Sequence, residues 1–284
     1  MTHTYGKMVP DPWTIPNIVF FRNSISRRIC KNNLGLRNEM LKLYWKMRKS
    51  AQETKLYRNK KALINEPYNI IMADPNDIEY MSPIKFDCWK DNGKVISGDW
   101  DYPRLLFNEN VPYWGDGMHK PKINSSLYNA MSDHFIHSIP WEESNFIKDV
   151  LEYIASKGPV WHGCSDRSDV IDRCHYIEDI YKSIEKNGYV SRKEAIYQNN
   201  QQINGRPREV YEEIFVNVGR DGELLFRGGG NHRLCIAKLL ELDKVPVIPV
   251  VRHSNWQDIR LKCYNCGEPP NSYVRQHPDL DEFI

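Results

Sequence analysis

The chain has 284 residues, of which 40% are hydrophobic and 12% aromatic, so it can bury a core and does not belong to the class of disordered chains. Its net charge of +2, from 39 lysines and arginines against 37 aspartates and glutamates, argues against a generic nucleic-acid binder. It contains no run of about 18 apolar residues and no apolar segment at the N-terminus, so we expect neither a transmembrane helix nor a signal peptide, and we expect a cytoplasmic location.

The first predicted unit is a basic helical arm at residues 1–65. Between Arg22 and Lys61 there are 13 lysines or arginines against two acids, which gives this segment +11 and leaves −9 for the rest of the chain. Residues 34–63 contain no proline and are predicted to be helical. The expected apolar stripe consists of Leu36, Met40, Leu43, Met47 and Ala51. The helix either packs on the body or offers residues 22–61 to an anionic partner: lipid, nucleic acid or an acidic protein.

The second predicted unit spans residues 66–284. Residues 67–83 indicate a strand that ends in an Asp-Pro-Asn-Asp turn, and residues 93–104 indicate a short strand followed by a tight turn. Residues 105–145 are irregular and rich in aromatic side chains, with one helix expected near 125–137. A stretch this aromatic is expected to pack over the body, because a solvated linker would not carry it.

The pattern of secondary structure is sharper from residue 166 onwards. A helix is predicted at 166–188, with cap residues at its start and Asn-Gly at its end. An antiparallel hairpin follows at 213–228, where Arg220-Asp221-Gly222 supplies the turn. A short helix is predicted at 231–242. The apolar run at 245–251 is interrupted by two prolines, which favours an edge strand.

A glycine-rich corner, LLFRGGGNHRLCIAKLLEL, joins the hairpin to the short helix. A helix start presents unpaired N–H groups and partial positive charge, and glycines allow close approach of a ligand. Asn231 can cap the helix, and the guanidinium of Arg233 matches phosphate geometry. These features predict a phosphate site. The alternative is a tight structural turn in which His232 is a satisfied core histidine and Arg233 forms a surface ion pair. The candidate phosphate-binding residues are Gly228, Gly229, Gly230, Asn231, His232 and Arg233.

The segment LLFRGGGNHRLCIAKLLELDKVPVIPV resembles the signature of the ParB/sulfiredoxin superfamily, in which a strand, a G-x-H-R-like turn, a helix and a Val-Pro strand follow one another. IEDIYKSIEKNGYV is similar to the preceding helix and NIIMADPNDIEY to the opening strand, and GDWD and HPDL also resemble full-length archaeal ParB-like proteins. The resemblance implies an α/β (α+β) fold with a mixed sheet and packed helices. The core would occupy about 67–80 and 160–260, with an insertion at about 84–160 and a short C-terminal tail.

The resemblance also implies a nucleotide ligand, because members of the superfamily bind CTP, ATP or ADP with the phosphates on this loop and helix start. Two differences from the superfamily pattern limit the functions that the resemblance implies. Asn231 stands where sulfiredoxins have a catalytic cysteine, which argues against repair of oxidised cysteine. Only about 30 residues follow Val251, too few for the helix-turn-helix and dimerisation regions of partition proteins. The residues that would contact phosphates are Gly229, Gly230, Asn231, His232 and Arg233.

A phosphotransferase would need a carboxylate near the acceptor and usually Mg²⁺. The candidates are Glu178 and Asp179 in the helix at 166–188, and Asp99 and Asp101 in GDWD. Their alternatives are a solvated helix face and a tight turn around a packed tryptophan. The sequence thus leaves open a nucleotide-dependent phosphotransferase, a non-enzymatic nucleotide-switched or DNA-binding module, and a metal-dependent nuclease.

The seven cysteines have irregular spacing, which favours reduced thiols. Cys263 and Cys266 form the chain's one C-x-x-C pair, whereas structural zinc takes four ligands. We therefore expect no metal site and two ordinary cysteines in a turn. The alternative is a zinc site that His162 and Cys164, or Cys174 and His175, would complete.

Overall fold

The computed structural model describes residues 34–56, 64–111, 126–191, 194, 213–267, 269 and 271–283. Within these residues the chain is an α/β protein with one mixed, seven-stranded sheet, which confirms the predicted fold class. The strands are β1 (Ile71–Ala73), β2 (Tyr80–Met81), β3 (Lys94–Ile96), β4 (Leu105–Leu106), β5 (Ile214–Val218), β6 (Leu224–Gly228) and β7 (Val245–His253). Their order is β1-β7-β5-β6-β2-β4, and β3 also pairs with β7.

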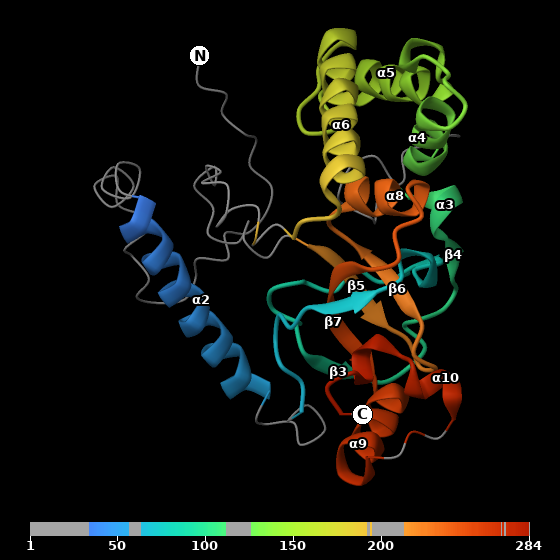
Figure 1. Ribbon diagram of the computed structural model, residues 1–284. Helices are drawn as coiled ribbons and strands as arrows, with labels where there is room; N and C mark the ends of the chain where they lie inside the picture. The colour runs from blue at the N-terminus through green and yellow to red at the C-terminus, as the bar shows by residue number, and fades with distance from the viewer. Residues whose placement is uncertain are drawn as a thin grey trace.

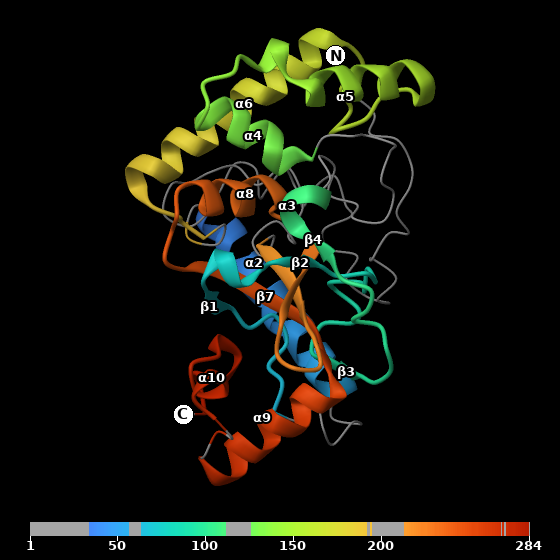
Figure 2. The ribbon, with the colours of Figure 1, turned by 90° about the vertical axis from the view of Figure 1, so that its right-hand side faces the viewer.

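Helices gather at both ends of this sheet (Figure 1). The α-helices are α2 (Leu34–Leu56), α3 (Phe107–Asn110), α4 (Leu127–Phe135), α5 (Asn145–Lys157), α6 (Arg167–Asn187), α8 (Asn231–Leu239), α9 (Ser254–Cys266) and α10 (Ser272–Arg275). Single 3₁₀ turns are η3 (Pro75–Asp77), η4 (Trp141–Glu143) and η6 (Pro278–Leu280). Figures 1 and 2 both show α8 between the strands and the layer formed by α4, α5 and α6. The start of α8 is therefore enclosed by elements that lie far away in the sequence.

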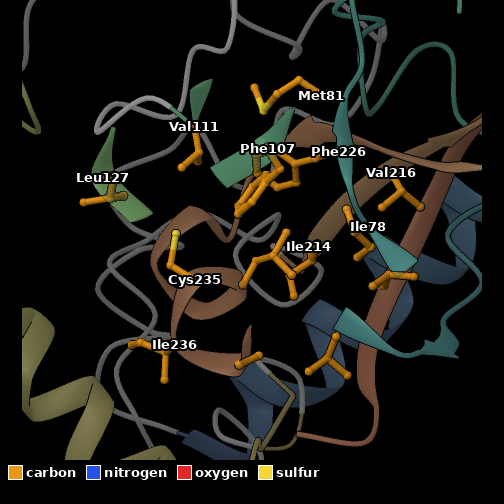
Figure 3. Close-up of a cluster of buried hydrophobic side chains, with 14 of the residues drawn as sticks. Ile78, Met81, Phe107, Val111, Leu127, Ile214, Val216, Phe226, Cys235 and Ile236 are labelled. Atoms are coloured by element: carbon orange, nitrogen blue, oxygen red, sulfur yellow. The ribbon is translucent and has the colours of Figure 1, made fainter. Parts of the chain in front are cut away.

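The predicted hairpin is present, and its alternation divides the core into two parts. β5 and β6 pair antiparallel, and every residue of β5 is buried. Ile214 and Val216 point into the larger cluster, whereas Phe215 points into a smaller cluster on the other face. Figure 3 shows Cys235 and Ile236 of α8 within the larger cluster. Because both faces are covered, the strands are apolar on both sides.

The prediction of an edge position for residues 245–251 is wrong. β7 lies inside the sheet, antiparallel to β1 and parallel to β5, and all its residues are buried. At Pro249 the lost N–H group is tolerated because the neighbouring ladders are interrupted there. β1 and β3 leave residues 248–250 without a strand partner on one side, and the register with β5 shifts next to the pair of Val216 and Pro249.

The range expected to be an insertion contributes to the sheet itself. β3 and β4 lie within residues 84–160, and they pair with β7 and β2. The helix expected near 125–137 is α4, where Ser126 accepts a hydrogen bond from the Asn129 amide. The irregular stretch ends in α5, which the sequence analysis did not anticipate. The layer above α8 is thus built by this range together with α6.

The basic helix α2 exposes Leu43, Met47 and Ala51 of the predicted apolar stripe. Leu43 and Met47 are 58% and 51% exposed, whereas Gln52 and Leu56 are buried. The Gln52 amide donates to the carbonyls of Lys90 and Asn92, at 3.3 and 2.9 Å. The described contacts of Gln52 thus pack the C-terminal part of α2 on the body. No helix in the described ranges is both long and apolar enough to cross a membrane.

Candidate functional site

The glycine-rich corner turns sharply between β6 and α8. Gly228, Gly229 and Gly230 have φ angles of 119°, 81° and 65°, a region that favours glycine. A Cβ on Gly229 would lie 2.7 Å from Cδ2 of Phe215, and one on Gly230 would lie 3.0 Å from Cγ1 of Ile214. The fold itself thus needs these glycines, because the corner crosses directly over the start of β5.

Asn231 does not cap the helix as predicted. α8 begins at Asn231, its N-cap is Gly230, and no side chain of the described residues caps it. The first turn therefore offers its N–H groups without a side-chain cap, and Asn231 itself is buried.

Arg233 points to a carboxylate of the protein. Its guanidinium lies 2.9 Å from Oε2 of Glu213, a fully buried side chain that immediately precedes β5. The Tyr189 hydroxyl donates to the same oxygen at 3.1 Å, and the guanidinium also lies over the Tyr189 ring. Burial, opposed in part by the charge of Arg233, raises the pKa of Tyr189, so the phenol stays protonated. Arg233 therefore forms an ion pair, as in the alternative interpretation of the sequence, but its partner is buried.

His232 occupies the other side of the first turn and has an unsatisfied nitrogen. Its Nε2 is sealed from solvent and has no hydrogen-bond partner in the described part of the chain. The rings of Trp161 and His162 both lie 6.2 Å from the His232 ring. Burial lowers the pKa of His232 well below its usual value, and the charges of Arg173, His162 and Arg233 lower it further. His232 is thus neutral near pH 7, and its Nε2 makes no hydrogen bond to a described residue.

His162 reaches this place from a left-handed turn before α6. Trp161, His162 and Gly163 have φ angles of 47°, 68° and 94°, and the turn is closed by an isolated bridge between Val160 and Cys164. Burial and the charge of Arg173 on α6 lower the pKa of His162 to about 4. The residue as a whole is exposed, and its ring centroid lies 6.2 Å from that of the His232 ring.

The structure does not bring Asp99 and Asp101 to the glycine-rich corner. Asp101 is buried and accepts hydrogen bonds from the Arg220 backbone N–H and guanidinium, while Asp99 is 87% exposed and pairs with the same guanidinium. Burial alone would raise the pKa of Asp101, but the hydrogen bonds from Arg220 outweigh burial and lower it. Arg220 lies at the turn of the hairpin, the length of β6 from Gly229, about 16 Å at strand spacing. Asp99 and Asp101 thus connect their own turn to the turn of the hairpin.

Glu178 and Asp179 also have other surroundings. Glu178 accepts a hydrogen bond from Trp141 Nε1 at 3.0 Å and lies 3.3 Å from Nε2 of His134 and 3.6 Å from Nζ of Lys182. It therefore ties α6 to η4 and α4. Asp179 is on the exposed side of α6.

The described residues contain no group of three or more His, Cys, Asp and Glu side chains that could hold a metal ion. Cys263 is buried and Cys266 exposed, both in the last turn of α9 rather than in the expected loop turn.

Sequence reasoning missed four residues that meet at this corner: Glu213, Tyr189, His162 and Arg173. They come from the residue before β5, the segment after α6, the left-handed turn and α6 itself. Their spacing in the sequence carries no signal, since long-range packing brings them together. An acid directly before an apolar strand was the one available hint, at Glu213, which the structure buries.

No protein-family model matches the chain, and comparisons with curated proteins and with solved structures gave no match.

Proposed function

We propose that this chain is a ParB/sulfiredoxin-like cytoplasmic protein that binds a nucleotide by its phosphates at the start of α8. The observation that carries the proposal is the sealed Nε2 of His232 in the first turn of the helix, which has no hydrogen-bond partner among the described residues. A buried polar atom without a partner costs about 1–3 kcal/mol, and a ligand oxygen bonded to a protonated Nε2 would recover that cost.

The charge around this atom favours an anionic ligand. The charges of Arg173 and Arg233 act on the His232 ring, and Arg233 is ion-paired with Glu213. The uncapped N–H groups of the first turn add partial positive charge in the same place. An anion with several acceptor oxygens, such as a phosphate, matches this set of donors. The nucleotide part of the proposal comes from the resemblance of the glycine-rich corner to ATP-, ADP- and CTP-binding proteins.

Phosphoryl transfer is the enzymatic form of this proposal. Of the carboxylates discussed above, Glu213 is the one that contacts the glycine-rich corner, through Arg233. Glu213 thus replaces Glu178, Asp179, Asp99 and Asp101 as the candidate carboxylate. Its ion pair suits it to orient Arg233 against a phosphate, and acceptance of a proton would require that ion pair to open.

The test is a thermal-shift panel with ATP, ADP, CTP, GTP and inorganic phosphate, each with and without Mg²⁺. A ligand at 100 times its Kd adds about 2.7 kcal/mol, or about 5 °C in a protein of this size. The variant is Arg173→Gln, because changing Arg233 would also strip Glu213 of its partner. We expect selective stabilisation by one nucleotide, with at least about tenfold weaker binding in this variant.

The matched control is Arg167→Gln, which changes an exposed arginine in the first turn of the same helix. This control should bind like the wild type. If no nucleotide stabilises the protein, or if both variants bind equally well, the glycine-rich corner is a structural turn and the proposal is wrong.

The exposed face of α2 favours a second candidate function, docking of the basic arm on an anionic partner. Leu43 and Met47 lie one helical turn apart, both exposed, in a helix that also carries Lys46 and Lys49. Nucleic acid or an acidic protein would suit this charge. Binding should fall steeply with salt and disappear when residues 22–61 are removed. Binding that survives the deletion would contradict this role.

A further inference from the structure

Two histidines from distant parts of the chain face each other beside the start of α8. The ring centroids of His162 and His232 are 6.2 Å apart, and the planes are inclined by 37°. Ring nitrogens that bind separate oxygens of one tetrahedral anion each need about 3 Å to their oxygen. The separation of the rings is therefore compatible with one anion shared by both histidines, and Nε2 of His232 is sealed and without a described partner.

The surroundings of this pair keep it uncharged while no anion is bound. Arg173 approaches from α6, Arg233 belongs to α8 itself, and Glu213 before β5 is engaged by Arg233. A proton on either ring would add positive charge next to these arginines in a desolvated place. A dianion bound between the rings has the opposite effect, because its negative charge favours the protonated imidazole.

We infer that His162 and His232 form a clamp for a tetrahedral dianion, such as a terminal phosphate group, and that the dianion binds together with a proton. This inference rests on the proposed function and adds two properties to it: the residues that hold the terminal group, and a dependence of affinity on pH. No bond is made or broken, and the proton comes from solvent.

The sign of the pH dependence follows from the two states. In the empty protein the pKa of His162 is about 4 and that of His232 is also lowered, so both rings are neutral near pH 7. In the bound protein the anion raises at least one of these pKa values. Binding then takes up a proton, and affinity rises as pH falls through the range between the free and bound pKa values.

The test measures the Kd of inorganic sulfate by titration calorimetry at several values between about pH 5 and 8. Sulfate is used because, unlike phosphate, it does not titrate in this range, so any change in Kd reports protonation of the protein. We expect Kd to decrease by up to about tenfold for each unit of decreasing pH, the limit for one linked proton. His162→Gln and His232→Gln should each flatten this dependence.

The matched control is His175→Gln, which changes an exposed histidine on α6, two residues after Arg173. It should keep the wild-type slope. A sulfate Kd that is independent of pH, a slope that survives both clamp variants, or no sulfate binding at the lowest pH would each overturn the clamp. The proposed function is judged separately, because the nucleotide panel near pH 7 does not depend on the slope.

Discussion

Replacing Asp279 by Asn should destabilise the protein more than any surface change. Asp279 is buried and lies between two buried arginines, with Arg252 Nε at 2.8 Å and Arg260 Nε at 3.0 Å from Oδ2. Trp256 Nε1 donates to the same oxygen at 2.9 Å. This cluster holds the C-terminal segment against β7 and α9, near the end of the sheet where α9 and α10 lie (Figure 1).

The expected magnitude follows from the loss of charge. Asn keeps the shape but leaves two buried guanidinium groups without their shared carboxylate. Removing one partner of a buried ion pair costs about 3–5 kcal/mol. Burial would raise the pKa of Asp279, but Arg252 and Arg260 hold it far below its usual value. This stabilisation is present at neutral pH and is lost only in strong acid, as pH falls through the lowered folded pKa.

The assay is urea denaturation at pH 7 of the wild type, Asp279→Asn and the control Asp281→Asn. Asp281 is exposed, and its replacement should change the free energy of unfolding by no more than about 0.5 kcal/mol. A loss of less than about 1 kcal/mol in Asp279→Asn would refute the argument that this carboxylate neutralises both arginines. The same loss in both variants would refute it as well.

Three further outcomes are expected. Gly229→Ala should lower the free energy of unfolding without ligand by about 1–3 kcal/mol in urea, because its Cβ would meet Phe215 at positive φ. Asp101→Asn should cost about 1–2 kcal/mol in the same assay, since Arg220 is partly exposed, yet leave nucleotide binding in the thermal-shift panel unchanged. The urea midpoint of the wild type should decrease as the pH falls from 6.5 towards 4, and it should decrease less in His162→Gln. The reason is that His162 binds a proton in this pH range in the unfolded chain but not in the folded protein.

Elements with local signals could be predicted from the sequence. α6 begins after Asp166, whose side chain accepts a hydrogen bond from the Asp169 amide, and it ends at Gly188. The hairpin turns at Arg220-Asp221-Gly222, as its turn residues indicate. Such signals act over a few residues and need no tertiary context.

Neighbours in space could not be predicted in the same way. The prolines of β7 suggested an edge, but the strand lies inside the sheet, and the short strands β1 and β3 leave Pro249 unpaired on one side. The stripe of α2 suggested its buried face, but Leu43 and Met47 are exposed, whereas Gln52 and Leu56 are buried. At the candidate site the sequence indicated the glycines and His232, while long-range packing alone joined His162 to them.

The most direct measurement of the central claim is the backbone amide NMR spectrum of the protein, titrated with the nucleotide that stabilises it most. A phosphate site at the start of α8 predicts the largest chemical-shift changes at the amides of Asn231, His232 and Arg233, which form the first turn of the helix. The changes should be smaller in Arg173→Gln. Shifts confined to α2 or to the turn around Arg220, or no shifts at saturating nucleotide, would contradict a phosphate site at the start of α8.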